Sequence, residues 1–145
     1  MAGEKTTSYA NSLLLLIFNG TAITGLAQNN ASPLTVLYLS LHTADPTAAG
    51  TQTSNEVAYT GYGRVSVNRS TGAGGLTVTT NSVALGSLTP FGACTAGTAT
   101  ATYFGIGTAS SGAGVLLYTG PITPSISISA GVTPQLTTST TITET

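Results

Sequence analysis

The fold is decided by residues 34–69, LTVLYLSLHTADPTAAGTQTSNEVAYTGYGRVSVNR. The start of this stretch, 34–41, is apolar at both odd and even positions, which predicts a strand buried on both faces. Its end, 63–69, alternates valines with polar residues and predicts a strand with one buried face. The residues between them, 43–56, predict a long polar loop that begins with the turn signal Asp45-Pro46.

The composition around this stretch is typical of an all-β protein. Thr makes up about a fifth of the 145 residues and there are 18 Gly; β-branched Thr suits a pleated surface, and Gly suits tight turns. The length fits a single domain. We therefore predict one β-sandwich domain over 1–145, with a polar N-terminal arm (1–8), a helix (9–18) and strands from 34 to 145.

The charge content limits the classes of partner. Only 5% of the residues are charged, and three Lys and Arg cannot build the basic patch that nucleic acids or anionic membranes require. A surface with so little charge lacks the repulsion that keeps proteins apart, which favours a protein that sits against other protein. The single Cys94 allows no internal disulfide and is expected to be a small buried or semi-buried residue.

The N-terminal third predicts the one helix. The run Leu13–Phe18 is the strongest apolar segment, Ser8 or Ser12 could cap the helix, and Asn19-Gly20 is a stop signal. The run is too short to span a membrane, which takes about 20 residues. A cleaved leader ending near residue 27 is disfavoured because Glu4 stands beside Lys5 and leaves the start barely basic.

About eight short strands with closely spaced turns predict a β-sandwich or jelly roll. After the strand at 63–69 the glycine-rich residues 72–75 predict a hairpin turn. Residues 86–98 predict a loop, and Gly120-Pro121 is expected to break the chain between two separate strands. The remaining strands are expected at 76–79, 81–85, 99–106, 115–118 and 125–129, with one or two more over 132–143.

The residues offer no convincing catalytic or metal site. Asp45 and Glu56 are two carboxylates on one loop with few groups nearby to shift a pKa. His42 and Asp45 could join a serine on paper, but no Gly-x-Ser-x-Gly motif is present, and a local hydrogen bond between these two explains their spacing better. Ligands for a metal are too few in any cluster. We predict neither an enzyme nor a bound cofactor.

The residues that stand out are Glu56, Tyr59, Tyr62, Arg64 and Arg69. Tyrosines next to arginines could form a platform for sugar or nucleic acid. A packed corner where the long loop rejoins the sheet is favoured over such a platform, and a protein interface, where Tyr and Arg are enriched, is the other alternative. We therefore treat these five as candidate interface or loop-anchoring residues.

Four motifs give the chain a family resemblance: LSLHTADP at 39–46, NEVAYTGYGRVSV at 55–67, FGIG at 104–107 and LLYTG at 116–120. Their order and spacing resemble those of small virion proteins of tailed phages, from about residue 8 to the C-terminus. Members are often labelled tail-fibre proteins. Similar proteins act as capsid cement, or decoration, proteins: jelly-roll subunits that sit as dimers on an HK97-type shell.

The resemblance implies a structural protein on the outer surface of a phage capsid, bound across joints between major capsid subunits. Its partners would be the major capsid protein and a second copy of itself, with neither nucleic acid nor membrane. The alternative is a tail or head fibre component that contacts the host surface. The C-terminal residues 137–145 are richer in Thr than the resemblance implies. We expect the N-terminal arm and one open sheet edge to face the shell.

Overall fold

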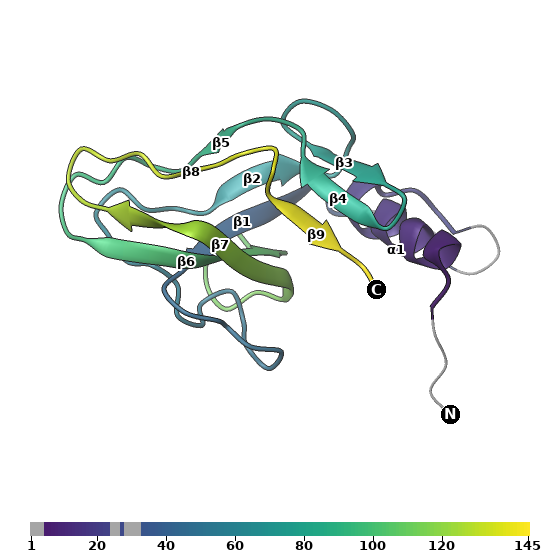
Figure 1. Cartoon of the computed structure of the whole chain (residues 1–145), viewed down its shortest axis with the longest axis horizontal. Coiled ribbons are helices and arrows are strands. Elements are labelled where there is room, and N and C mark those ends of the chain that lie inside the picture. Colours follow the sequence, from purple (N-terminus) through teal and green to yellow (C-terminus); the bar gives the residue numbers. More distant parts are fainter. Residues whose placement is uncertain (1–4, 24–26, 28–32) are drawn as a thin grey trace. The chain divides into compact units, whose positions relative to one another are not determined.

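The computed structural model describes residues 5–23, 27 and 33–145, and it confirms an all-β fold with one short helix. The strands form antiparallel sheets consistent with a β-sandwich (Figure 1). The described residues hold nine strands rather than about eight, and the jelly-roll form stays a prediction. The elements are α1 (Thr7–Asn19), β1 (Val36–His42), β2 (Val65–Asn68), β3 (Leu76–Thr79), β4 (Ser82–Leu85), β5 (Thr89–Pro90), β6 (Ala99–Gly107), β7 (Leu116–Ile128), β8 (Gln135–Leu136) and β9 (Thr141–Thr143).

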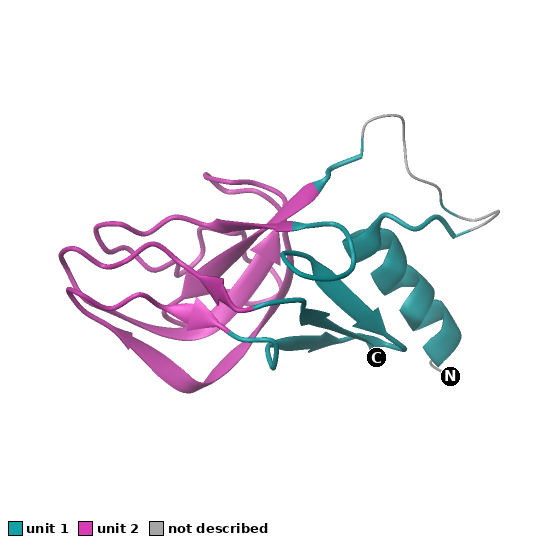
Figure 2. Ribbon diagram, turned by 90° about the horizontal axis from the view of Figure 1, so that it is seen from above, with its two compact units in different colours: residues 1–35, 68–87, 137–145 teal, residues 36–67, 88–136 magenta. Residues whose placement is uncertain are grey.

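The chain divides into two compact units, shown in Figure 2. Unit 1 comprises residues 1–35, 68–87 and 137–145, and unit 2 comprises 36–67 and 88–136. Unit 1 contains α1 and the sheet β3-β4-β9. Unit 2 contains nearly all of the sheet β2-β1-β6-β7 and the small sheet β5-β8.

Helix α1 begins two residues earlier than predicted, because Thr6 and not Ser8 or Ser12 caps it. The Thr6 side chain accepts a hydrogen bond from the backbone N–H of Tyr9 at 3.3 Å. The predicted stop is confirmed, since Gly20 takes the left-handed conformation at the helix end. No helix in the described ranges is long and apolar enough to cross a membrane.

The core of unit 1 lies between helix α1 and the sheet β3-β4-β9. Figure 1 shows α1 beside this sheet. Ala10, Leu14 and Phe18 recur at helical spacing and are buried. Across the sheet, Leu76 pairs with Leu85, and both are buried. The last strand is held by its neighbour, because Asn81 Nδ2 donates to the carbonyl of Glu144 at 2.9 Å while the Asn81 carbonyl accepts from the Glu144 N–H at 2.8 Å.

The central strand β1 fits its apolar pattern. It runs over 36–42 rather than 34–41, and every residue from Leu37 to His42 except Tyr38 is buried, so burial on both faces is confirmed. It pairs with β6 so that Leu39 lies opposite Ile106 and Leu41 opposite Phe104. These apolar pairs form the centre of unit 2.

Strand β7 corrects the sequence prediction of two strands separated at Gly120-Pro121. It is one strand of 13 residues that runs through both residues. Proline cannot donate to a ladder, but β7 is the last strand of its sheet, where one side of the backbone has no ladder partner. The pairing with β6 is interrupted by a register shift between the pairs Tyr103–Pro121 and Ala101–Ile126.

Residues 86–98 are also more ordered than the predicted loop. They include the short strand β5, which pairs with β8, and a bridge between Thr60 and Ala96. Cys94 is 1% exposed in this segment, which agrees with the expectation of a small buried or semi-buried residue.

Candidate functional site

The long loop 43–56 is closed at its base by backbone hydrogen bonds. The N–H of Thr43 donates to the Asn55 carbonyl at 2.7 Å, and His42 and Glu56 form an antiparallel bridge. The predicted turn at Asp45-Pro46 is confirmed, since Asp45 Oδ1 accepts from the N–H of Thr47 at 2.8 Å. The loop therefore returns Glu56 to the edge of the central strand.

Glu56 and Arg64 form a bidentate ion pair at this base. Arg64 Nε lies 2.8 Å from Glu56 Oε1, and Nη2 lies 2.8 Å from Oε2. The side chain of Arg64 is 3% exposed and that of Glu56 is 16% exposed. Two parallel hydrogen bonds between a guanidinium and a carboxylate are strong and fix the geometry. The pair holds the end of the long loop against β2.

Tyr62 and the 108–114 loop complete this cluster. The hydroxyl of Tyr62 donates to Glu56 Oε1 at 2.8 Å and accepts from the N–H of Leu41. Arg64 also donates to the carbonyls of Ala109 at 3.0 Å and Gly112 at 2.8 Å. Burial raises the pKa of the Tyr62 phenol far above its ordinary value, and the hydrogen bond to Glu56 raises the pKa of Arg64. The tyrosine therefore remains a neutral donor and the arginine remains a cation.

The side chain of Tyr59 is buried and is not exposed on the surface. It is 7% exposed, its hydroxyl donates to the Gly92 carbonyl at 2.8 Å, and its ring meets Tyr62 edge-on at 5.4 Å. Tyr62 in turn stacks on Phe91 at 6.2 Å. Because these rings contact one another, they do not form an open platform on which a sugar or a base could stack.

Gln52 belongs to this region but carries no sequence signal. It is completely buried, and its Oε1 accepts from the N–H of Ala109 at 2.9 Å. It occupies a slot that exists because Gly107 and Gly114 lack side chains; a Cβ on either would overlap it. Its Nε2 has no partner among the described residues. A glutamine in a polar loop is normally exposed, so its role emerges only from the folded chain.

His42 is held by Ser40 and not by Asp45, which corrects the predicted local hydrogen bond. His42 Nδ1 lies 2.8 Å from the Ser54 carbonyl, and Nε2 lies 2.8 Å from the Ser40 hydroxyl. Since a carbonyl only accepts, Nδ1 carries the proton and Nε2 accepts from Ser40. Both side chains are fully buried, and a Cβ on Gly105 would lie 2.7 Å from Nε2. The pair therefore has no room for a substrate beside it.

The stability of unit 2 is expected to fall on mild acidification. Burial lowers the pKa of His42 below its ordinary 6.5, so near pH 6 the unfolded chain binds a proton that the folded chain does not. The free energy of unfolding is highest above about pH 6.5 and decreases as the pH falls toward the pKa that His42 has in the folded protein. Denaturant midpoints measured between pH 7.5 and 5.5 test this. The variant His42→Gln should remove the slope, and an equal slope in both proteins would contradict the assignment.

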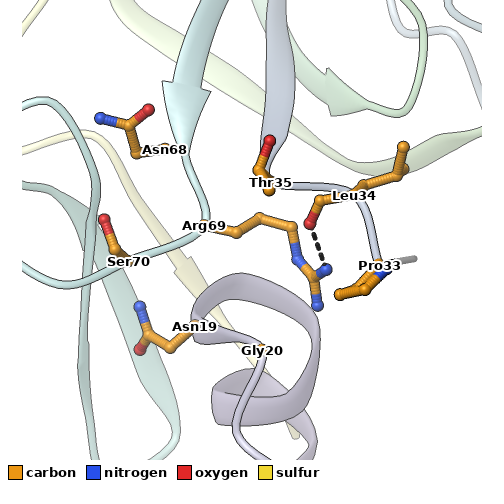
Figure 3. A pocket seen from close by; sticks show the side chains of 8 residues that line it. All are labelled: Asn19, Gly20, Pro33, Leu34, Thr35, Asn68, Arg69 and Ser70. Carbon is orange, nitrogen blue, oxygen red and sulfur yellow. Dashed lines mark hydrogen bonds between the residues drawn. The ribbon is translucent and has the colours of Figure 1, made fainter. Parts of the chain in front are cut away.

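Arg69, which the sequence grouped with the other four candidates, lies instead in unit 1. Its Nε donates to the carbonyl of Ile17 at 2.6 Å and its Nη2 to that of Leu16 at 2.7 Å. Its Nη1 donates to the Leu34 carbonyl at 2.6 Å, the bond drawn in Figure 3. The carbonyls of Leu16 and Ile17 belong to the last turn of α1, where no helical donor remains. Arg69 thus caps the C-terminal end of α1 from 52 residues away.

A hollow of about 380 Å³ lies beside this cap, entirely within unit 1. Figure 3 shows the guanidinium of Arg69 between the end of α1 and residues 33–34, with Asn68 and Ser70 on the other side of the chain. The hollow is lined by Asn19, Gly20, Pro33, Leu34, Thr35, Asn68, Arg69 and Ser70.

Most charged side chains of the described residues are bonded to other groups of the same chain. Glu56 pairs with Arg64, Lys5 pairs with Glu144, and Arg69 is surrounded by carbonyls. Asp45 is the one acidic side chain of the described ranges with neither an ion pair nor burial. The outer surface of the described residues therefore carries almost no unneutralised formal charge.

Comparison with known proteins identifies the family. The family model described as podophage GP4 fiber I protein gp80 matches residues 4–143, which is nearly the whole chain. A search of curated proteins finds none that matches. The chain therefore belongs to the podophage GP4 fiber I protein gp80 family and is a structural, fibre-type protein of a phage virion.

Proposed function

We propose that this protein is a capsid cement protein. It binds the outside of the phage shell across joints between major capsid subunits and stabilises the shell. The single observation that carries the proposal is the near absence of free charge on the described surface. Such a surface can pack closely against protein without leaving charges buried and unpaired.

The mechanism is mechanical. Each copy adds contact area that the shell alone lacks and so resists the pressure of packaged DNA. A specific contact of standard size buries about 1,600 Å² in total. Many symmetric copies make the effect collective, so each contact can be individually weak. The internally bonded clusters suit this role, because a rigid subunit loses little entropy on docking.

The proposed partners are the major capsid protein and a second copy of this chain as a homodimer. Neither nucleic acid nor membrane is proposed as a partner, and no enzymatic role is proposed. The long edge strand β7 carries Pro121 and Pro124, which cannot donate to an added strand. We therefore favour packing of surfaces over strand addition along the middle of this edge, in contrast to the edge contact expected from the sequence.

The deciding experiment is the copy number per particle, measured by quantitative mass spectrometry of purified virions. Hundreds of copies in fixed ratio to the major capsid protein are expected. A handful, or a few dozen, would contradict the cement role.

The alternative role is a tail or head fibre component that contacts the host surface. The description of the matching family as a fibre protein favours it. The two roles differ in location, so labelling of virions with an antibody against this chain separates them. Labelling over the whole head agrees with cement, and labelling confined to tail or fibres agrees with the adhesin.

Attachment to the shell is expected to depend only weakly on salt. Salt screens interactions between exposed charges, with a Debye length of about 8 Å at 0.15 M and about 3 Å at 1 M, and this chain offers few such charges. Virions washed in 0.1 M and 1 M sodium chloride and then pelleted should retain the same amount of the protein. Steep release at moderate salt would contradict a contact of low charge.

A further inference from the structure

We propose that the hollow beside Arg69 binds a carboxylate of a partner protein, an Asp or Glu side chain or a chain terminus. This inference rests on the proposed function in that the partner is a protein of the shell. The hollow itself is a property of unit 1 and is tested separately below. Its volume of about 380 Å³ falls within the usual range of about 300–1,000 Å³ for small-ligand sites.

The first argument is the charge of Arg69. Lys5 and Arg64 each face a carboxylate, whereas Arg69 has only backbone carbonyls around it within the described residues. The end of α1 contributes roughly half a negative charge, which leaves about half of the positive charge uncompensated. Of the described cations, this one alone has no formal counter-charge, and it lines a concave surface.

The second argument is the supply of free donors. A guanidinium has five N–H groups, and the bonds to the carbonyls of Leu16, Ile17 and Leu34 use three of them. Two N–H groups therefore remain for a ligand. A carboxylate has two oxygens and can accept from both of them.

The third argument selects a carboxylate over a phosphate. Phosphate sites are typically found at helix N-termini, where N–H groups and the positive end of the dipole meet the anion. This hollow lies at the C-terminal end of α1, where the carbonyls of the last turn repel excess negative charge. A ligand with a single negative charge matches the residual charge of Arg69, and a doubly charged phosphate does not.

Direct binding can be followed by NMR, because the chain has only two arginines and hence two Nε–H signals. Sodium acetate is the probe, titrated against sodium chloride and inorganic phosphate at equal ionic strength. We expect acetate to shift the Arg69 Nε–H and the amides of 68–70 in a saturable manner, with Arg64 unmoved as the internal control. No saturable shift at Arg69, an equal shift at Arg64, or a response to phosphate but not to acetate would overturn the proposal.

A matched pair of variants connects the hollow to the partner. Ser70→Glu adds a negative charge to an exposed residue that lines the hollow and follows Arg69 directly, while Ser110→Glu makes the same charge change on an exposed residue of the 108–114 loop. Ser70→Glu should abolish the acetate response and weaken attachment to shells stripped of this protein about tenfold, with Ser110→Glu unchanged in both assays. If Ser70→Glu loses the acetate response but attaches normally, the hollow is not the contact with the shell. If wild-type protein binds acetate but no shell, the cement function fails and the anion site stands.

Discussion

Replacing Glu56 with alanine is expected to lower the free energy of unfolding of unit 2 by about 3 kcal/mol. Removing one partner of a buried ion pair costs about 3–5 kcal/mol, because the other charge stays buried and unneutralised. Arg64 would be left in that state, since its side chain is 3% exposed. The value lies at the lower end because Glu56 is 16% exposed, and water can enter the vacated space. Chemical denaturation measures the loss in the free energy of unfolding, and hydrogen exchange of the β1 and β6 amides shows that the loss lies in unit 2.

Asp45→Ala is the matched control, since it removes a carboxylate from the same loop without breaking an ion pair. It should cost well under half as much, through loss of the turn hydrogen bond alone. The double variant Glu56→Ala with Arg64→Leu should be less unstable than Glu56→Ala, because it removes the orphaned charge. Equal losses for Glu56→Ala and Asp45→Ala would show that the buried pair contributes nothing special.

Replacing Arg69 with lysine is expected to destabilise unit 1 by about 2 kcal/mol. Lysine keeps the charge, but one ammonium cannot reproduce a planar fork that reaches three carbonyls. At least one carbonyl at the end of α1 would lose its donor, and each charge-assisted hydrogen bond contributes about 1.5–3 kcal/mol. Arg69 is only partly buried, so water can reach the site, and this keeps the total near the lower value. Loss of hydrogen-exchange protection in α1 and β3 is the measurement.

Ser70→Ala is the control for this substitution, because it alters the adjacent exposed side chain and leaves the cap intact. The protection of α1 in Ser70→Ala should match that of the wild type. Unchanged protection of α1 in Arg69→Lys would mean that the helix end does not depend on its distant cap. Amides of β1 and β6 report on unit 2 and show whether the effect is confined to unit 1.

Much of the fold could be predicted because it depends on local patterns. The apolar residues of β1 indicated burial on both faces, the Leu-rich run indicated α1, and Asn19-Gly20 indicated its end. The prediction failed at Gly120-Pro121, where a local rule for proline was applied without the sheet. Whether proline interrupts a strand depends on whether the strand is at an edge, and this is a property of the pairing.

The candidate site was predicted in composition but not in arrangement. Glu56, Tyr59, Tyr62 and Arg64 lie within nine residues of one another in sequence, and the structure brings them together. Arg69, five residues after Arg64, belongs to the other unit. Gln52 was missed because its burial depends on glycines more than 50 residues later. Contacts at such separations leave no periodic signal in the sequence.

The sequence by itself determined the all-β class, the place of the helix, the turn at Asp45 and a chain with very few charges. These follow from side-chain shape, hydropathy and backbone preference, which act over a few residues. Only the tertiary structure decided which group neutralises which charge: Glu144 for Lys5, Glu56 for Arg64 and carbonyls of the helix end for Arg69. An ion pair or a cap needs two groups within about 3–4 Å, and that distance is set by how remote segments pack.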